Sequence, residues 1–235
     1  MMERLDKFLA AQGKGTRKEV GRLIRSGAVA VDGVPVRDPA AKVDPSCQTV
    51  AVGGSPILWQ EHLYIMMNKP AGVLSATEDR RQKTVLDLLP EDLRRRGLFP
   101  AGRLDKDTTG LLLITDDGDL AHRMLSPKKH VYKLYQARLD APVTPEDVRA
   151  FEEGVRWEEE VYAPARLWAG EGDPFVAFAQ VHEGRFHQVK RMFQARGKTV
   201  LSLKRLKIGG LSLDSTLQEG ECRLLAPEEV CQILR

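Results

Sequence analysis

The sequence is poor in cysteine and has no long apolar run. Its three cysteines, Cys47, Cys222 and Cys231, are odd in number and lack a CxxC spacing, so we expect neither a disulfide framework nor a zinc site. No uncharged apolar run approaches the roughly 18 to 20 residues of a membrane span. The charged N-terminus MMERLDKF lacks the apolar core of a secretory signal. We therefore expect a cytoplasmic protein without a membrane partner.

Net charge is also small, +3 over 235 residues, but the basic residues are unevenly distributed. The segment 184–213, called the basic segment below, contains no Asp or Glu. A basic stretch without acids favours an anionic partner, and nucleic acid is the first candidate. The eight cations of this segment are Arg185, Lys190, Arg191, Arg196, Lys198, Lys204, Arg205 and Lys207.

Residues 1–57 predict a small N-terminal α/β module. The apolar residues of ERLDKFLAAQG have the i, i+3, i+4 spacing of an amphipathic helix. TRKEVGRLIRSG predicts a second helix, because Thr16 and Glu19 have the spacing of a capping box. AVAVDGVPV alternates around an Asp-Gly pair, which indicates a β-hairpin, and CQTVAV adds a further strand.

The second predicted helix places Lys18, Arg22 and Arg25 opposite its apolar face. This row of cations is either a solvated helix surface or a docking surface for phosphates. GKGT, just before it, lacks the GxxxxGK frame of a phosphate loop and follows a helix rather than a strand. The glycines and proline of VGGSPILWQ predict a linker, and a second domain then spans 61–235.

The second domain predicts an α+β fold. Strands and helices do not alternate regularly, and no GxGxxG motif is present, which argues against a doubly wound nucleotide-binding fold. We expect a mixed, largely antiparallel β-sheet flanked by helices. The predicted strands cover 62–67, 110–115, 131–139, 175–182 and a pair around 209–210; the predicted helices cover 84–89, 118–125, 145–153 and 187–196.

Two carboxylates precede an apolar strand in GRLDKDTTGLLLITDDG. A calcium loop would require oxygen ligands where the sequence has Leu-Leu-Leu-Ile-Thr, so we expect no metal site. Asp116 or Asp117 is explained as the N-cap of the following helix. Asp105 and Asp107 have no such explanation, which leaves either a solvated connector or a carboxylate that reacts.

Two further clusters carry polar residues beside apolar ones. In HVYKLYQARL, strand alternation places Lys133 and Tyr135 on one face and Tyr132 on the other. In EGRFHQVKRMFQARG, an apolar helical stripe leaves His187 and Lys190 on or near the other faces. On composition alone, a strand tyrosine is more often a core residue, and a lone histidine more often a hydrogen-bonding helix residue than a catalyst.

Taken together, these clusters resemble the pseudouridine synthases of the RsuA type, which modify small-subunit ribosomal RNA. The resemblance rests on NKPAGVLSAT, GRLDKDTTGLLLITDDG, KLY, GRFHQVKRMF and LKRLKIGGLSLD, in that order. The front module is similar to the RNA-binding domain of ribosomal protein S4. The resemblance extends from about residue 3 to residue 230 and implies an isomerase that breaks the N-glycosidic bond of a uridine and rejoins the base through C5.

The resemblance also assigns residues to this reaction. The essential carboxylate of the family matches Asp105, its tyrosine matches Tyr135, and its basic partner matches Lys190, with the adjacent Arg191 as the alternative. A nucleophilic carboxylate must be ionised, and inside a dry pocket a nearby cation keeps it so. The sequence does not distinguish attack on the anomeric carbon from attack on C6 or action on the ribose.

A uridine in a helical stack is inaccessible, so the resemblance implies that it is flipped into the pocket. We expect RNA backbone contacts from the front module and the basic segment, and no metal or organic cofactor. The partner is then small-subunit ribosomal RNA or an assembly intermediate of that subunit, bound by a monomer. Two alternatives are a synthase for large-subunit ribosomal RNA and a non-catalytic ribosome-assembly factor. The residues expected to bind RNA are Lys18, Arg22, Arg25, Arg103, Arg185, His187, Arg191, Lys204 and Arg205.

Overall fold

The chain folds as two compact units. The structure, a computed structural model, describes residues 2–45, 47–57, 61–95 and 97–235. One unit comprises Met1–Leu63 with Leu89–Leu98, and the other comprises Tyr64–Leu88 with Phe99–Arg235. The sequence predicts one continuous second domain from residue 61, because composition does not reveal that a short internal stretch groups with the first unit. The end of the predicted linker, residues 58–60, lies outside the described residues.

The front unit has the predicted helices and hairpin. The capping box is confirmed: Glu19 donates its backbone N–H to Thr16 Oγ1 at 3.3 Å, and its Oε2 accepts from the Thr16 N–H at 2.8 Å. Asp32 and Gly33 both have positive φ, as the hairpin turn requires. Helices α1 (Leu5–Ala11) and α2 (Arg17–Arg25) pack on a sheet of order β3-β2-β5-β6 (Val34–Pro35, Val29–Val31, Val50–Val52, Ser55–Pro56), beside the pair β1 (Glu3–Arg4) and β4 (Lys42–Val43).

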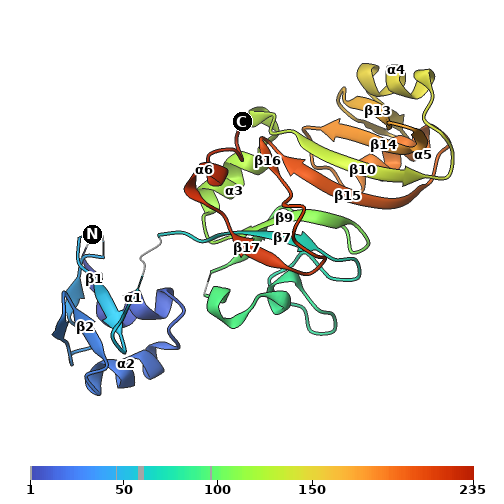
Figure 1. Cartoon of the computed structure of the whole chain (residues 1–235). Coiled ribbons are helices and arrows are strands. Elements are labelled where there is room, and N and C mark those ends of the chain that lie inside the picture. Colours follow the sequence, from blue (N-terminus) through green and yellow to red (C-terminus); the bar gives the residue numbers. More distant parts are fainter. Residues whose placement is uncertain (1, 46, 58–60, 96) are drawn as a thin grey trace. The chain divides into compact units, whose positions relative to one another are not determined.

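The large unit is built on a nine-stranded, mixed and mostly antiparallel sheet, which confirms the predicted α+β class (Figure 1). Its strand order is β13-β14-β10-β15-β9-β7-β17, with β8 on β9 and β16 on β15. The strands are β7 (Tyr64–Lys69), β8 (Phe99–Ala101), β9 (Thr109–Thr115), β10 (Lys133–Leu139), β13 (Arg166–Gly170), β14 (Asp173–Val181), β15 (Val200–Ile208), β16 (Leu211–Ser212) and β17 (Cys222–Leu224).

Helices cover each half of this sheet. Phe151 of α4 and Met192 and Phe193 of α5 pack into one apolar core, whereas Leu120 and Met124 of α3 pack into the other. The predicted helix at 84–89 is a single 3₁₀ turn. The helices are α3 (Gly118–Leu125), α4 (Pro145–Glu153), α5 (Gln188–Ala195) and α6 (Pro227–Val230); the 3₁₀ turns are η1 (Val85–Leu88), η2 (Glu91–Leu93) and η3 (Pro127–Lys129); and β11 (Arg156–Trp157) pairs with β12 (Glu160–Val161).

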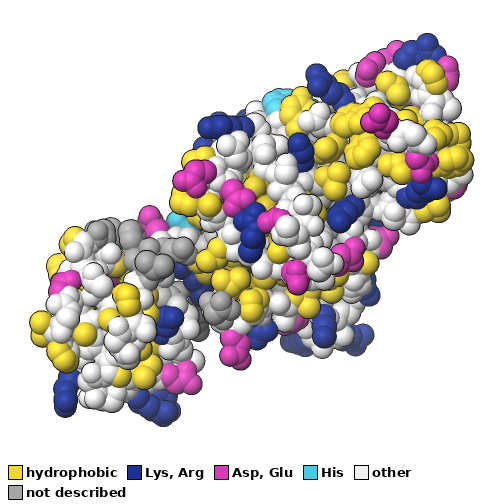
Figure 2. Space-filling model, in the orientation of Figure 1, with side chains coloured by type: hydrophobic (Ala, Val, Ile, Leu, Met, Phe, Trp, Pro, Cys, Tyr) yellow, Lys and Arg dark blue, Asp and Glu magenta, His cyan; other side chains and the backbone are white. Residues whose placement is uncertain are grey.

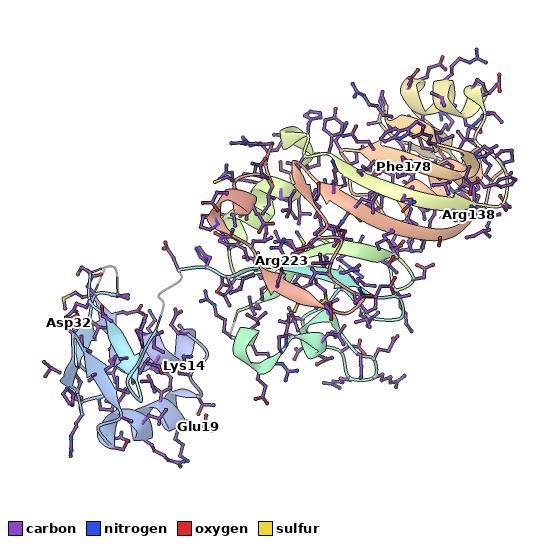
Figure 3. The ribbon with its side chains drawn as sticks, viewed as in Figure 1. Lys14, Glu19, Asp32, Arg138, Phe178 and Arg223 are labelled. Carbon is purple, nitrogen blue, oxygen red and sulfur yellow. The ribbon has the colours of Figure 1, made fainter. Side chains whose placement is uncertain are left out.

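The other face of the β13-β14-β10-β15 half carries side chains that alternate with the core residues. Trp168 and Phe178 lie directly opposite each other on β13 and β14, and their rings stack at 5.7 Å. Trp168 is exposed. Phe178 is labelled in Figure 3, and Figure 2 shows hydrophobic side chains gathered over this part of the unit. This face is therefore distinct from the helix-covered face that holds the core.

The two halves of the sheet meet at a short parallel contact between β9 and β15. Gly110 lies opposite Arg205 in this contact, and its φ of 98° is outside the range that side chains favour. A Cβ at this position would lie 2.3 Å from the Arg205 carbonyl oxygen. Only glycine permits this approach, and it brings the loop before β9 next to β15 and β10.

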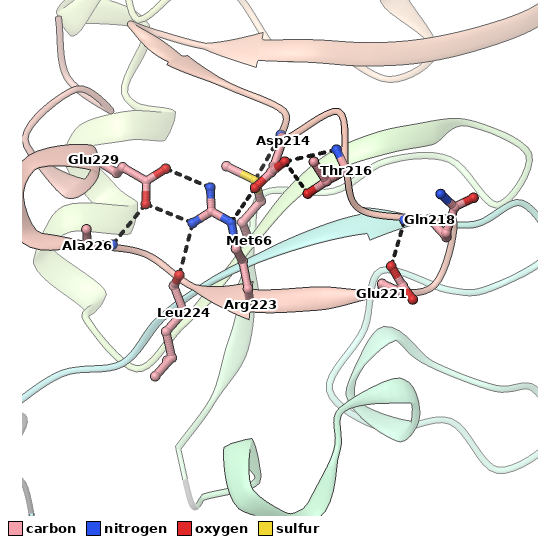
Figure 4. A network of polar contacts seen from close by, with 9 residues as sticks. All are labelled: Met66, Asp214, Thr216, Gln218, Glu221, Arg223, Leu224, Ala226 and Glu229. Atoms are coloured by element: carbon pink, nitrogen blue, oxygen red, sulfur yellow. Dashed lines mark hydrogen bonds and ion pairs between the residues drawn. The ribbon is translucent and has the colours of Figure 1, made fainter.

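A polar network holds the C-terminal segments on the opposite edge of the sheet (Figure 4). Arg223 of β17 donates to Asp214 at 2.7 Å and, through two nitrogens, to both oxygens of Glu229 at 2.8 Å. Asp214 also accepts from the backbone N–H and hydroxyl of Thr216, and these bonds, with Arg223, lower its pKa to about 2. The network joins β17, α6 and the chain after β16.

Candidate active site

A cleft of about 550 Å³ opens in the large unit, within the range of about 300–1,000 Å³ typical of small-molecule sites. Three segments form it: the loop before β9, the paired strands β10 and β15, and the turn that leads into α5. Its walls combine apolar groups with several cations. The lining residues used below are Arg103, Asp105, Lys133, Tyr135, Arg185, His187, Lys190 and Arg205.

Asp105 lies in this cleft beside two residues of the α5 turn. Its Oδ2 is 3.2 Å from the Lys190 ammonium, and its Oδ1 is 3.4 Å from His187 Nε2. The side chain is 26% exposed, so it is partly sheltered yet reachable from the cleft. Among the described residues, these two are the groups within ion-pair distance of its carboxylate. One cation therefore faces a carboxylate that retains free acceptor capacity.

Asp107 shares the same lysine. Lys190 Nζ lies 2.6 Å from Asp107 Oδ1, closer than to Asp105, and this hydrogen bond lowers the pKa of Asp107. The Asp107 side chain is 73% exposed and is not among the cleft-lining residues. The structure thus places it at the solvent side of the pair, where it helps to hold Lys190.

A buried lysine supports the loop that carries Asp105. Lys69, at the end of β7, is fully buried and donates to the carbonyl oxygens of Pro70, Lys106 and Thr108 at 2.9–3.3 Å. Burial lowers its pKa to about 8. Because the Lys106 and Thr108 carbonyls flank Asp107, these hydrogen bonds from Lys69 fix the backbone of the loop that follows Asp105. Ser75 adds a pair of hydrogen bonds to the backbone of residue 104.

The opposite wall consists of residues from β10 and β15. As predicted, Lys133 and Tyr135 share a face, and Tyr132 is exposed on the other. Arg205 is 4% exposed; it donates through Nε to the Leu111 carbonyl at 2.8 Å and through Nη1 to the Tyr135 hydroxyl at 3.4 Å. Lys133 donates to the His182 carbonyl, and burial lowers its pKa to about 8. Arg205 therefore supports Tyr135 from within the sheet. It is buried, and not the exposed RNA contact that the sequence predicts.

Two of the arginines expected to bind RNA pair with the same acid. Arg185 and Arg191 both pair with Glu160, at 3.2 and 3.1 Å. Arg191 also lies 3.5 Å from the Tyr162 hydroxyl. The structure thus brings Lys190, and not the adjacent Arg191, to Asp105. His187 begins α5 in the left-handed conformation, with φ 52°.

The remaining expected RNA contacts are dispersed. Arg103 is exposed and lines the cleft. Lys204 alternates with Arg205 along β15, so it lies on the sheet face away from the cleft. Lys18, Arg22 and Arg25 are exposed on α2 in the front unit. Of the residues expected to bind RNA, the structure therefore gathers Arg103, Arg185, His187 and Arg205 at the cleft.

Other predictions from the sequence concern a helix cap, the cysteines, metal sites and membrane spans. Asp117 is the N-cap of α3, and its side chain accepts from Leu120 N–H at 2.9 Å, as predicted. All three cysteines are free thiols. Within the described ranges, no three His, Cys, Asp or Glu side chains are grouped closely enough to hold a metal ion. No helix there is long and apolar enough to cross a membrane.

Comparison with known proteins defines the class. Residues 63–195 match the family model described as RNA pseudouridylate synthase, and residues 3–47 match the S4 domain. A solved pseudouridylate synthase superposes with a TM-score of 0.67 at 37% identity, covering 98% of this chain and 99% of that one. The fold is thus that of a pseudouridine synthase, which is an isomerase.

The curated relatives agree over almost the full chain. YtzG, an uncharacterised RNA pseudouridine synthase of Bacillus subtilis, is 50% identical over 230 residues, which cover 97% of this chain and 96% of that protein. Ribosomal small subunit pseudouridine synthase A of Escherichia coli is 43% identical over 235 residues, covering 98% and 100%. The chain therefore belongs to the RNA pseudouridylate synthase family and has an S4 domain at its N-terminus.

Sequence reasoning missed three residues of this site. Lys69 and Lys133 are buried cations at a strand end and a strand start, and Phe186 is an exposed ring beside His187. A lysine two residues after the apolar run YIMM is a usable signal for Lys69, because an unpaired charge at the end of a buried strand is costly. The sequence pattern does not indicate that Phe186 is exposed, since aromatic side chains in helices and loops are usually buried.

Proposed function

We propose that this enzyme converts a uridine of small-subunit ribosomal RNA into pseudouridine, with Asp105 as the group that reacts. The observation that carries the proposal is the Asp105–Lys190 contact of 3.2 Å inside the cleft. The small-subunit target is supported by the printed name of the Escherichia coli relative. A cytoplasmic location goes with that substrate.

The reaction needs little besides a positioned carboxylate. The C1′–N1 bond breaks, a C1′–C5 bond forms, and a proton leaves C5 while N1 gains one, so atoms and electrons balance without a co-reactant. Asp105 acts as a nucleophile or on the ribose, and the Lys190 ammonium compensates its negative charge. Tyr135 lines the same cleft, and its ring is available to stack on the uracil.

The target uridine must leave its stack to reach Asp105. Extrusion of a base costs a few kcal/mol. Phosphate contacts offset that cost, and exposed cations at Arg103 and on α2 of the S4 domain are available for them. We propose that the N-terminal 1–57 module binds ribosomal RNA and that the 61–235 domain performs the chemistry.

Pseudouridine mapping in both ribosomal RNAs tests this function. Cells without the gene should lack one small-subunit pseudouridine, and a plasmid copy should restore it. A plasmid with Asp105→Asn should not restore it, whereas Asp107→Asn should, because Asp107 lies outside the cleft. If the pseudouridine that is lost with the gene lies in large-subunit RNA, that RNA is the substrate in place of the proposed one. Restoration by the Asp105→Asn plasmid would overturn the proposed chemistry.

A further inference from the structure

Phe186 is the most exposed large hydrophobic residue in the described part of the chain, at 66%. It lies directly before His187, whose ring contacts the Asp105 carboxylate at 3.4 Å. A single exposed apolar side chain needs no explanation on most surfaces. This one lies between Arg185 and His187, which both line the cleft, and His187 contacts the reacting group.

The ring is held in place by two neighbours. The imidazole of His187 stacks on it with 3.8 Å between ring centroids and 18° between planes. The Arg191 guanidinium carbon lies 5.1 Å from its centroid, and Arg191 is itself fixed by Glu160 at 3.1 Å. His187 adopts a left-handed backbone conformation, which is uncommon for a residue other than glycine and marks positions that the surroundings enforce.

We propose that Phe186 is a stacking platform for an unpaired nucleobase next to the target uridine. This inference rests on the proposed function, because it takes RNA as the substrate. When a uridine is flipped, its neighbour in the strand loses a stacking partner. With His187 and Arg191 in place, Phe186 is still 66% exposed, and the exposed part of its ring can replace that partner, since aromatic side chains stack on any base.

The charges around the ring favour a nucleic acid over an apolar protein partner. Arg185 precedes it in the sequence, and Lys190 and Arg191 follow it. These cations pair with Glu160, Asp105 and Asp107 of other segments, while the basic segment that begins at residue 184 contains no acid of its own. These cations suit the phosphates on either side of a stacked base. Stacking supplies affinity without base selectivity, so the platform would anchor the neighbouring nucleotide and leave the choice of uridine to the cleft.

Phe175 provides a matched control. It is also an exposed phenylalanine, at 37%, and the Arg138 guanidinium carbon lies 5.7 Å from its ring centroid. It lies in β14, and its chain neighbours Pro174 and Val176 do not line the cleft, whereas the neighbours of Phe186, Arg185 and His187, both do. The two rings therefore share chemistry and a cationic neighbour, and they differ in their position relative to Asp105.

Two RNA probes separate stacking from charge: dodecauridylate, and an abasic ribose-phosphate dodecamer of equal charge. Titration of the full-length protein should show that Phe186→Ala weakens binding of dodecauridylate about tenfold, with unchanged binding of the abasic dodecamer. Phe186→Trp should restore the affinity, and dodecauridylate should quench its added tryptophan fluorescence. Phe175→Ala should behave as wild type with both probes.

Equal loss of affinity for both probes in Phe186→Ala would overturn the platform, because the effect would then be electrostatic. Unchanged binding of both probes, or wild-type protein that does not prefer dodecauridylate to the abasic dodecamer, would also overturn it. None of these titrations depends on turnover. Failure of the platform is therefore distinguishable from failure of the proposed function, which the Asp105→Asn complementation decides.

Discussion

Two clusters in the large unit have the same composition, one cation between two carboxylates, but differ in how fully their bonds are satisfied. Lys190 lies between Asp105 and Asp107, and Arg223 lies between Asp214 and Glu229. Their burial is similar: the Asp105 side chain is 26% exposed and the Asp214 side chain 22%. Burial alone therefore does not distinguish the two.

The difference lies in the remaining hydrogen bonds. Asp214 accepts from Thr216, and Glu229 accepts from the Ala226 N–H. Arg223 donates to Glu229 through two nitrogens. Such charge-assisted, bidentate pairs are strong and fix geometry. Asp105, in contrast, has Lys190 and His187 as its described ion-pair neighbours and otherwise faces the cleft. A fully bonded cluster holds the fold, and an incompletely bonded one is available to a substrate.

The largest expected effect sharpens this contrast at the cleft. Lys190→Met should lower turnover about a hundredfold, because the Asp105 carboxylate loses the cation that keeps it ionised in the cleft. The urea midpoint of unfolding should stay near that of wild type, and Lys190→Arg should recover most of the activity. A Lys190→Met protein with normal turnover, or one that is mainly unstable, would remove the distinction between the two clusters.

Arg223→Met should give the reverse pattern. Removing the guanidinium leaves Asp214 and Glu229 without their shared cation, and we expect a loss of about 2 kcal/mol in the free energy of unfolding. Turnover per folded molecule should not change, because none of the residues of the network lines the cleft. Urea unfolding and a turnover assay on the same preparation check both points. Loss of activity without loss of stability would contradict the structural role.

A smaller effect concerns Lys69, which is bonded to carbonyls instead of carboxylates. Its pKa of about 8 lies below the ordinary 10.5, so the folded state binds fewer protons than the unfolded state between these values. Stability should therefore rise with pH across this window, and Lys133 adds a similar rise. In Lys69→Met only the Lys133 share should remain. Urea unfolding at several pH values compares the slopes, and parallel slopes would show that Lys69 is not desolvated.

Local patterns predicted most elements of the fold. The capping box at Thr16, the Asp32-Gly33 turn and the N-cap at Asp117 each depend on a few neighbouring residues, and all three are confirmed. The edge strands β13 and β17 were missed because they are short or polar and are defined by their partners. The grouping of residues 89–98 with the first unit also depends on contacts between distant parts of the chain.

For the candidate site, the sequence predicted the central residues but not those that support them. The resemblance named Asp105, Tyr135 and Lys190, and the structure brings all three to one cleft. Arg205 was expected at the surface with the other cations of the basic segment. Its burial follows from strand alternation on β15 and from the approach of Gly110, which the charge pattern does not report. The roles of Lys69 and Phe186 required coordinates.

The most direct test compares the two aspartates that share Lys190. Single-turnover pseudouridine formation should be measured for Asp105→Asn and Asp107→Asn on ribosomal RNA in which the target uridine has been mapped. Asp105→Asn should be slower than wild type by more than about a thousandfold, and Asp107→Asn by less than about tenfold, with similar stability. Comparable rates for Asp105→Asn and wild type would contradict the account.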